Sequence, residues 1–229
     1  MTISQDDKRL LAAAEVERER HADWRPLLGQ LVARFETGDF ATGARLVAAL
    51  TEAAEAADHH PDVDLRYPHV EVRLSSHDVG GLTMRDVRLA AEISDLAAGM
   101  GVTAAGPEAL QAVEWALDTW DLDEVRPFWA AVLGLDDPGE GDEATDPGGR
   151  WPALWLQGTE RPDPSAGTPA QRWHADVRIA PEVVEQRMAA AIAAGGRLVT
   201  DEYAPAFWVL ADPQGNQACL TTWQGRDAE

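Results

Sequence analysis

The chain has 229 residues, with 40 acidic and 19 basic side chains, which gives a formal net charge of −21 at neutral pH. A surface this negative repels phosphate groups, so nucleic acids and anionic membranes are not expected as partners. With 45% hydrophobic residues the chain can bury ordinary cores, and its length allows one large domain or two small ones.

The cysteine content and the first residues limit the kinds of site and the cellular compartment expected for the protein. A single cysteine, Cys219, excludes an intrachain disulfide and any zinc site made of several cysteines. Segment 1–7 lacks the basic and apolar regions of a leader, and no apolar run reaches the length of about 18 residues that a membrane helix needs. We therefore expect a soluble cytoplasmic protein.

The first part of the chain begins with a helix, a strand and a second helix. Residues 6–22 are charged with scattered apolar positions and predict an exposed helix, whereas residues 31–36 alternate as a strand does. Asp39 can then cap a helix. That helix is expected to end near His59, because Pro61 disfavours helical geometry in the residue before it.

A second strand and a further helix follow. Residues 66–76 alternate with a period of two, which places Val70, Val72 and Leu74 on one face and His69 on the other, towards solvent. A turn at 80–81 leads to Thr83-x-x-Asp86, a capping box that opens a helix over 84–98. Helices on one face of a short antiparallel sheet predict an α+β domain.

Four of the six histidines lie in this region, at positions 59, 60, 69 and 77. Imidazole exchanges a proton near neutral pH, and a neighbouring carboxylate tunes when it does so. Glu55 lies one helical turn before His59 and either orients that imidazole or is an exposed charge. Asp86 is either a helix cap alone or also part of a site. The simpler alternative for the whole stretch is a polar helix end followed by a turn.

The motifs EAADHHP at 55–61 and VEVRLSSHDVGGLTMRD at 70–86, with Tyr67 between them, resemble the pterin-4a-carbinolamine dehydratase family. The resemblance runs without a gap from Glu55 to about Ile93, and weaker similarity reaches back to Trp24. Ser76 stands where the family usually has threonine, so the hydroxyl group is kept.

This resemblance implies an enzyme that dehydrates 4a-hydroxytetrahydropterin to quinonoid dihydropterin and water, with a small-molecule pterin as its partner. It implies that the catalytic residues are three histidines, of which His59 and His77 serve as acid and base and His60 holds the substrate. It also implies that the substrate-binding site is completed by Glu55, Asp58, Ser76 and Asp86, with Asp58 and Glu55 setting the orientation and pKa of the imidazoles. The reaction needs no metal or organic cofactor. Because such domains commonly self-associate, we expect a homo-oligomer, a dimer.

A small-residue segment at 101–107 precedes a change in composition, since eight of the nine tryptophans lie beyond residue 110. We divide the chain here into domains 1–104 and 105–229. An internal repeat with an offset of roughly sixty residues follows. Strand 113–117 precedes a helix over 124–133 that ends at Gly134, and strand 173–179 precedes a helix over 182–194 that ends at Gly195. Further strands are expected at 153–157, 206–210 and 217–222.

The segments FWAAVLG at 128–134 and ADPQGN at 211–216 resemble the vicinal oxygen chelate superfamily, which includes glyoxalases and bleomycin-resistance proteins. Its paired βαβββ modules form a cupped sheet that often holds a divalent metal. The superfamily's ligand positions fall here on Glu114, His174 and Cys219, with Gln157 as a further position. Strand parity places Glu114 and His174 on the cup side and packs Trp115 and Trp173 beneath the helices. The tryptophans either line a pocket for a flat ligand or pack in an ordinary core.

Cys219 stands where that superfamily commonly has glutamate, and a neutral thiol is not an equivalent ligand. We therefore predict no tightly bound transition metal. Three functions remain open. The protein is a pterin dehydratase; or its chemistry lies in the second half while the first acts on a different substrate or is structural; or it binds a small molecule, as in specialised metabolism or resistance.

Overall fold

The computed structural model describes residues 6–133, 135–149, 151–161, 173–211 and 217–225. By packing, the chain divides into two compact units, one that runs to Gln111 and one that begins at Ala112. Two short segments after residue 178, Ile179–Val183 and the residues from Thr222 on, are grouped with the first unit. The domain boundary at 104/105 remains a prediction. The expected helix end at Gly134 and most of the motif at 211–216 lie outside the described residues.

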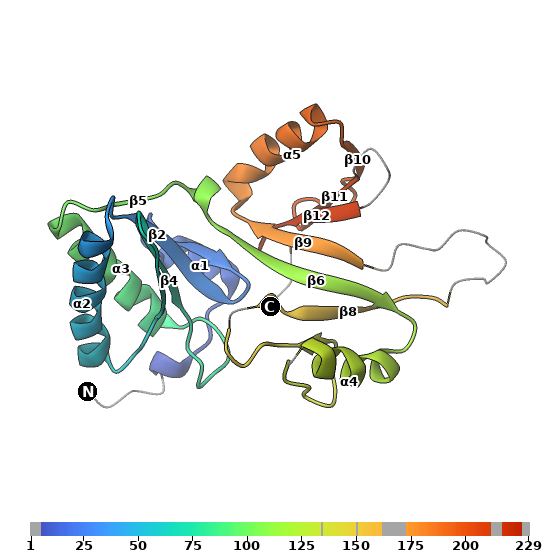
Figure 1. Cartoon of the computed structure of the whole chain (residues 1–229), viewed down its shortest axis with the longest axis horizontal. Coiled ribbons are helices and arrows are strands. Elements are labelled where there is room, and N and C mark those ends of the chain that lie inside the picture. Colours follow the sequence, from blue (N-terminus) through green and yellow to red (C-terminus); the bar gives the residue numbers. More distant parts are fainter. Residues whose placement is uncertain (1–5, 134, 150, 162–172, 212–216, 226–229) are drawn as a thin grey trace. The chain divides into compact units, whose positions relative to one another are not determined.

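The first unit contains a five-stranded antiparallel sheet with helices on one face (Figure 1). Its strands are β1 (Arg25–Leu27), β2 (Gln30–Glu36), β3 (Asp62–Leu65), β4 (His69–Leu74) and β5 (Thr103–Ala104), in the order β1-β2-β4-β3, with β5 also pairing with β2. Its helices are α1 (Ala13–Glu19), α2 (Phe40–Ala57) and α3 (Met84–Gly99), and its short 3-10 segments include η1 (Asp6–Lys8) and η2 (Pro107–Ala109). The predicted α+β class is confirmed.

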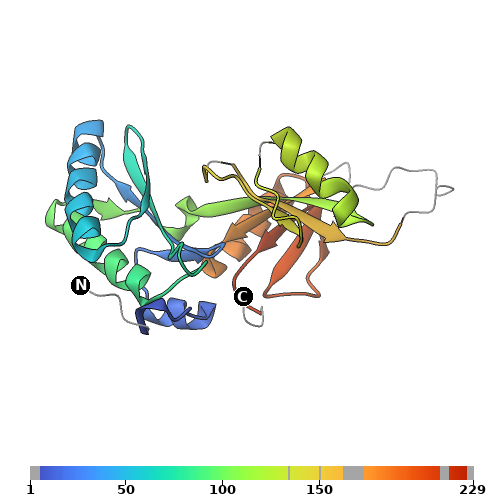
Figure 2. The same cartoon turned by 90° about the horizontal axis from the view of Figure 1, so that it is seen from below.

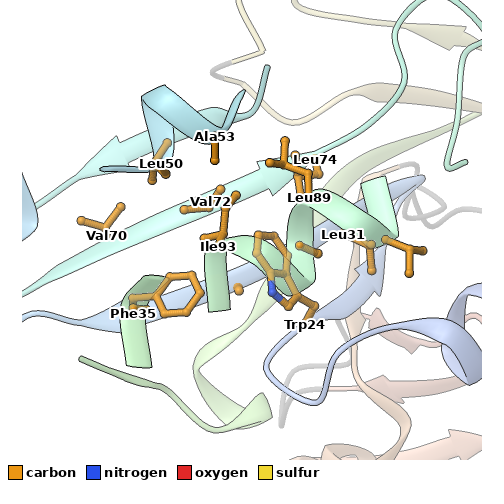
Figure 3. Packing of buried hydrophobic residues seen from close by; sticks show 14 of the residues in the cluster. Trp24, Leu31, Phe35, Leu50, Ala53, Val70, Val72, Leu74, Leu89 and Ile93 are labelled. Carbon is orange, nitrogen blue, oxygen red and sulfur yellow. The ribbon is translucent and has the colours of Figure 1, made fainter. Parts of the chain in front are cut away.

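The core of this unit follows from the alternation of β4, in which Val70, Val72 and Leu74 are fully buried. Helices α2 and α3 pack on that face, and Figure 3 shows their side chains meeting those of β2 and β4. Trp24 lies within the same core and donates its indole N–H to Ser94 Oγ at 3.0 Å. A buried indole needs such a partner, because an unmade hydrogen bond in an apolar core costs about 1–3 kcal/mol.

Three short strands of this unit, β1, β3 and β5, were not expected. β3 pairs with β4 as a hairpin, and the connection between them takes up residues 66–68. The strand predicted over 66–76 therefore begins only at His69. Residues Thr103–Ala104, which were expected to belong to a linker, pair with β2. Strands of two to four residues are too short to show a period, and here a longer neighbouring strand decides their conformation. The helix predicted over 6–22 is also shorter, at Ala13–Glu19.

The second unit contains a seven-stranded sheet in the order β10-β11-β12-β9-β6-β8-β7. Its strands are β6 (Gln111–Thr119), β7 (Glu143–Ala144), β8 (Leu154–Gly158), β9 (Trp173–Ile179), β10 (Arg197–Thr200), β11 (Phe207–Ala211) and β12 (Gln217–Thr221). Its helices are α4 (Leu122–Leu133) and α5 (Val184–Ala193), and α5 is preceded by η4 (Pro181–Val183).

The predicted repeat is present in this sheet, because β6 leads into α4 and β9 leads into α5. Central strands β6 and β8 are parallel, as are β9 and β12, whereas the outer pairs are antiparallel. Helix α4 packs on β8 (Figures 1 and 2), and α5 packs on β10 (Figure 1).

The predicted burial of two tryptophans is wrong, since Trp115 is 48% exposed and Trp173 is 37% exposed. Helix α4 covers Leu117 and the facing side chains of β8, but not Trp115. Trp173 instead meets Trp129 of α4 edge to face, with ring centroids 4.9 Å apart. Strand parity identified the face of the sheet, but the position of the covering helix decided which residues on it are buried.

Candidate active site

The end of α2 directs the backbone of the histidine pair. Asp58 adopts the left-handed conformation, with φ of 50°. Its N–H donates to the carbonyl of Glu55 at 3.3 Å, and the N–H of His59 donates to the carbonyl of Ala54 at 3.1 Å. These two bonds form the Schellman motif that ends many helices. Aspartate tolerates this conformation better than most residues other than glycine, and the reversal turns His59 back towards the core.

His59 is buried and lies against a carboxylate from another helix. Its ring is 7% exposed, and Nε2 lies 2.7 Å from Oδ1 of Asp86, the third residue of α3. An ionised carboxylate can only accept, so Nε2 carries the proton of this bond and Nδ1 is left as the acceptor of the neutral ring. In hydrolytic triads the carboxylate instead holds Nδ1–H and leaves Nε2 as the base, so the contact here fixes the opposite tautomer by the same means.

Asp86 is fully buried, and its second oxygen accepts three further bonds. Oδ2 receives the backbone N–H of Thr83 at 2.7 Å, the hydroxyl of Ser76 at 2.8 Å and the hydroxyl of Thr83 at 3.2 Å. The bond from the backbone of Thr83 completes the predicted capping box at the start of α3. Asp86 therefore caps the helix and also holds His59.

The pKa of Asp86 reflects a competition between burial and hydrogen bonding. Burial raises the pKa, but the bonds from His59, from the backbone N–H of Thr83 and from the Ser76 hydroxyl outweigh it, so the pKa lies below its ordinary value. Asp86 is therefore ionised at neutral pH and serves as the acceptor of the bond from His59.

His60 faces solvent, in contrast to its neighbour. Its side chain is 58% exposed, and Nε2 lies 3.1 Å from Oε1 of Glu55, which is itself 71% exposed. Glu55 thus contacts His60, whereas the partner of His59 is Asp86. The carboxylate of Asp58 makes no hydrogen bond within the described part of the chain, and its visible contribution is the backbone turn.

His77 lies in an exposed turn directly after Ser76. The turn is closed by N–H groups of Val79 and Gly80, which donate to the Ser76 carbonyl at 3.1 and 3.0 Å. Because the Ser76 hydroxyl donates to Asp86, the segment that carries His77 is anchored to the same carboxylate that holds His59.

An ion-pair cluster that the sequence analysis did not identify fixes this turn. Asp78 accepts from Arg85 at 2.6 Å and from Lys8 at 3.0 Å. The bond from Arg85, followed by that from Lys8, lowers the pKa of Asp78 to about 2. Both partners are distant enough in sequence that no local pattern indicated the pairing.

In the second unit, the expected ligand positions do not all come together. His174 and Cys219 gather with Asp176, which was not expected as a ligand, whereas Glu114 lies outside that group. The position of Gln157 as a ligand remains a prediction. Burial and then the nearby Asp176 raise the pKa of the Cys219 thiol to about 12, so the thiol is protonated at neutral pH when no cation is bound.

No helix among the described residues is long and apolar enough to cross a membrane.

The α+β fold and the His59–Asp86 pair define a domain that holds a buried imidazole against an ionised carboxylate. Residues 9–96 match the family model described as pterin 4 alpha carbinolamine dehydratase, and residues 114–221 match a glyoxalase-like domain. The chain therefore belongs to the pterin-4a-carbinolamine dehydratase family through its first part. Its second part carries the glyoxalase-like domain.

Relatives of the first part are short proteins provisionally named pterin-4-alpha-carbinolamine dehydratase. One from Chloroflexus aurantiacus is 38% identical over 88 residues, which cover 38% of this chain and 95% of the relative. Another, from Roseiflexus castenholzii, is 40% identical over 90 residues, covering 38% of this chain and 96% of the relative. A crystal structure described as a transcriptional coactivator/pterin dehydratase from Brucella melitensis is 26% identical, with a TM-score of 0.38, and covers 39% of this chain and 99% of that one.

The buried Asp86 carboxylate makes the stability of the first unit depend on pH. Its folded-state pKa is below the ordinary value of 3.8, so its contribution is present above that value and is lost as the pH falls through the folded-state pKa. Asp86→Asn should lower the free energy of unfolding by about 1–3 kcal/mol at pH 7. Urea unfolding should show this difference shrinking below about pH 4.

Asp95→Asn, at an exposed position on the same helix, is the matched control and should change the free energy of unfolding by less than about 0.5 kcal/mol. An Asp86→Asn deficit of equal size at pH 7 and pH 3 would contradict the assigned role of the Asp86 charge.

Proposed function

We propose that the first unit dehydrates 4a-hydroxytetrahydropterin to quinonoid dihydropterin. The observation that carries the proposal is the buried His59–Asp86 contact of 2.7 Å in a domain of the dehydratase family. In this reaction the C4a–O bond breaks and the oxygen takes up a proton, so that water leaves. The adjacent ring nitrogen N5 loses its proton, and a C=N double bond forms between C4a and N5. One proton is therefore supplied and one is collected, and no electrons are exchanged with another reactant.

Two groups are needed because hydroxide is a poor leaving group. An acid must protonate the departing oxygen while a base removes the proton from nitrogen. Imidazole suits both tasks near neutral pH, because each form is accessible there. We assign these tasks to His59 and His77. Asp86 contacts His59 directly and also accepts a bond from Ser76, the residue before His77.

In this mechanism Asp86 acts on His59 as the buried aspartate acts in a hydrolytic triad. It accepts the hydrogen bond from Nε2–H, holds the ring in one orientation and stabilises the imidazolium that forms when Nδ1 takes up a proton. Asp86 is thus a positioning residue, and Ser76 and Thr83 support it in turn. The serine keeps the hydroxyl that this network requires.

His60 has a different task in this proposal. It is solvent-facing and is paired with Glu55, so its ring can rotate towards a bound pterin and hold the hydroxyl group or the ring edge. Such contacts are made in the ground state and the transition state alike, and they affect KM more than kcat.

The assignment of the three histidines leads to a kinetic prediction. His59→Ala and His77→Ala should each lower kcat for pterin dehydration by about 10²–10⁴-fold, which is the usual worth of a positioned acid or base. His60→Ala should mainly raise KM. His59→Ala/His77→Ala should lose much less than the product of the two single losses if both residues serve one proton-transfer event.

His69→Ala is the control, because His69 lies half-buried on the β4 face away from the core and has no assigned role. Rates are to be measured above the uncatalysed dehydration. If all single variants kept rates near that of the wild type while circular dichroism showed an intact fold, the dehydratase assignment would be wrong.

A pair of substitutions at Asp58 separates its backbone from its carboxylate. Glycine adopts the left-handed conformation without cost, so Asp58→Gly should keep kcat within about threefold of the wild type. Asp58→Val should destabilise the fold by about 1–2 kcal/mol, because a side chain branched at Cβ is strained there, and should lower kcat. Steady-state rates and thermal unfolding measure both effects. An equal loss of kcat in the two variants would show that the carboxylate itself tunes an imidazole.

We also propose that the protein forms a homo-dimer, as dehydratase-family domains commonly do. An uncovered apolar sheet face is not its basis, because the face opposite the helices carries ion pairs such as Arg34–Glu71, at 2.9 Å. β3 lies at the edge of its sheet and offers unpaired backbone groups instead. Light scattering at micromolar concentration should give twice the 24.8 kDa of one chain, and a value of 24.8 kDa would contradict the proposal.

A further inference from the structure

Three side chains capable of binding a metal meet on one face of the central strands of the second unit. Cys219 of β12 pairs directly with Asp176 of β9, so their side chains project from the same face of the sheet. His174 precedes Asp176 by two residues and therefore projects from that face as well. One nitrogen, oxygen or sulfur atom from each residue lies within 4.8 Å of the others.

One oxygen of the carboxylate in this group lacks a hydrogen-bonding partner. Asp176 is only 8% exposed, and its Oδ1 atom is buried without a hydrogen bond. His174 Nε2 lies 3.6 Å away, beyond hydrogen-bonding distance. A buried carboxylate oxygen without a partner is costly, and proteins normally pair such groups or place them on a metal ion.

A second carboxylate lies behind the histidine. Asp118 Oδ1 is 3.9 Å from His174 Nδ1, which is the ring nitrogen opposite the one nearer Asp176. Histidines that bind metals through one nitrogen usually present the other to a carboxylate, which fixes the ring orientation. Asp118 lies on that side of the ring, although 3.9 Å is longer than a direct hydrogen bond.

The donor set matches a cation of the zinc class. The sequence predicted no bound metal because Cys219 replaces the glutamate common in the vicinal oxygen chelate superfamily. The pairing of β9 with β12 supplies a carboxylate from the neighbouring strand instead. Imidazole nitrogen, carboxylate oxygen and thiolate sulfur are all zinc ligands, whereas calcium and magnesium prefer oxygen alone.

We infer that His174, Asp176 and Cys219 form a binding site for a divalent cation of the zinc class, with Asp118 orienting His174. Three protein ligands leave one position of a tetrahedral shell for water or for an oxygen atom of a small molecule. That pattern is typical of catalytic zinc sites, whereas structural ones are closed by four protein ligands.

The test uses the full chain, freed of metal by dialysis against a chelator and then titrated with zinc ions in competition with a chromophoric chelator. One ion should bind per chain. His174→Ala and Asp176→Asn should each weaken binding by about 100-fold or more, and Asp118→Asn by about 10-fold, as the loss of a residue behind a ligand usually does. Glu114→Gln is the matched control and should leave the affinity unchanged, because Glu114 lies outside the group.

Cobalt(II) provides a readout specific to the thiol. The wild type loaded with cobalt should show a thiolate-to-metal charge-transfer band, and Cys219→Ser should lack it. Zinc should also raise the melting temperature of the wild type but not that of Asp176→Asn. This variant should remain at least as stable as the wild type without metal, because it removes a buried carboxylate with one oxygen that has no hydrogen bond.

Four results would each overturn the inference. They are a wild type that binds no zinc at stoichiometric concentration, full affinity in Asp176→Asn, a loss of affinity in Glu114→Gln, and a cobalt complex without the charge-transfer band. The dehydratase assay is independent, because none of these residues lies in the first unit.

Discussion

The first unit depends on one buried carboxylate. Asp86 receives His59 from the end of α2, Ser76 from the segment after β4, and the backbone and hydroxyl of Thr83 at the start of α3. It thereby joins three parts of the chain at a point with no access to water. A carboxylate so buried is tolerated only because each of its oxygens accepts a bond. The fold and the candidate site therefore share their central contact.

Because Asp86 belongs to both, its role as a helix cap and its role in the candidate site are compatible. A capping box requires an acidic side chain at the third helical position, and the start of a helix favours its negative charge. Once ionised and fixed, the same carboxylate can hold a protonated imidazole nitrogen with its other oxygen. Helix initiation at Thr83 and orientation of His59 thus follow from one residue.

The two units differ in how many hydrogen-bond donors surround their buried aspartate. Asp86 is satisfied by donors from the chain itself, whereas Asp176 has an oxygen without one and lies beside a histidine and a thiol. Both share the proximity of histidine and carboxylate, but only the second group leaves charge for an added cation to neutralise. The number of donors around each carboxylate, more than the residue types, distinguishes the proposed acid/base pair from the proposed metal site.

The sequence by itself determined the features that arise from local periodicity and from residues close in the chain. These include the alternation of β4, the Asp39 and Thr83 caps, the end of α2, the repeat in the second unit and the set of histidines. Only the tertiary structure decided the pairings. His59 and Asp86 are 27 residues apart, and Asp176 meets Cys219 through the register of two parallel strands. Such contacts depend on how elements pack and which residues then face each other, and neither short-range spacing nor composition encodes that choice.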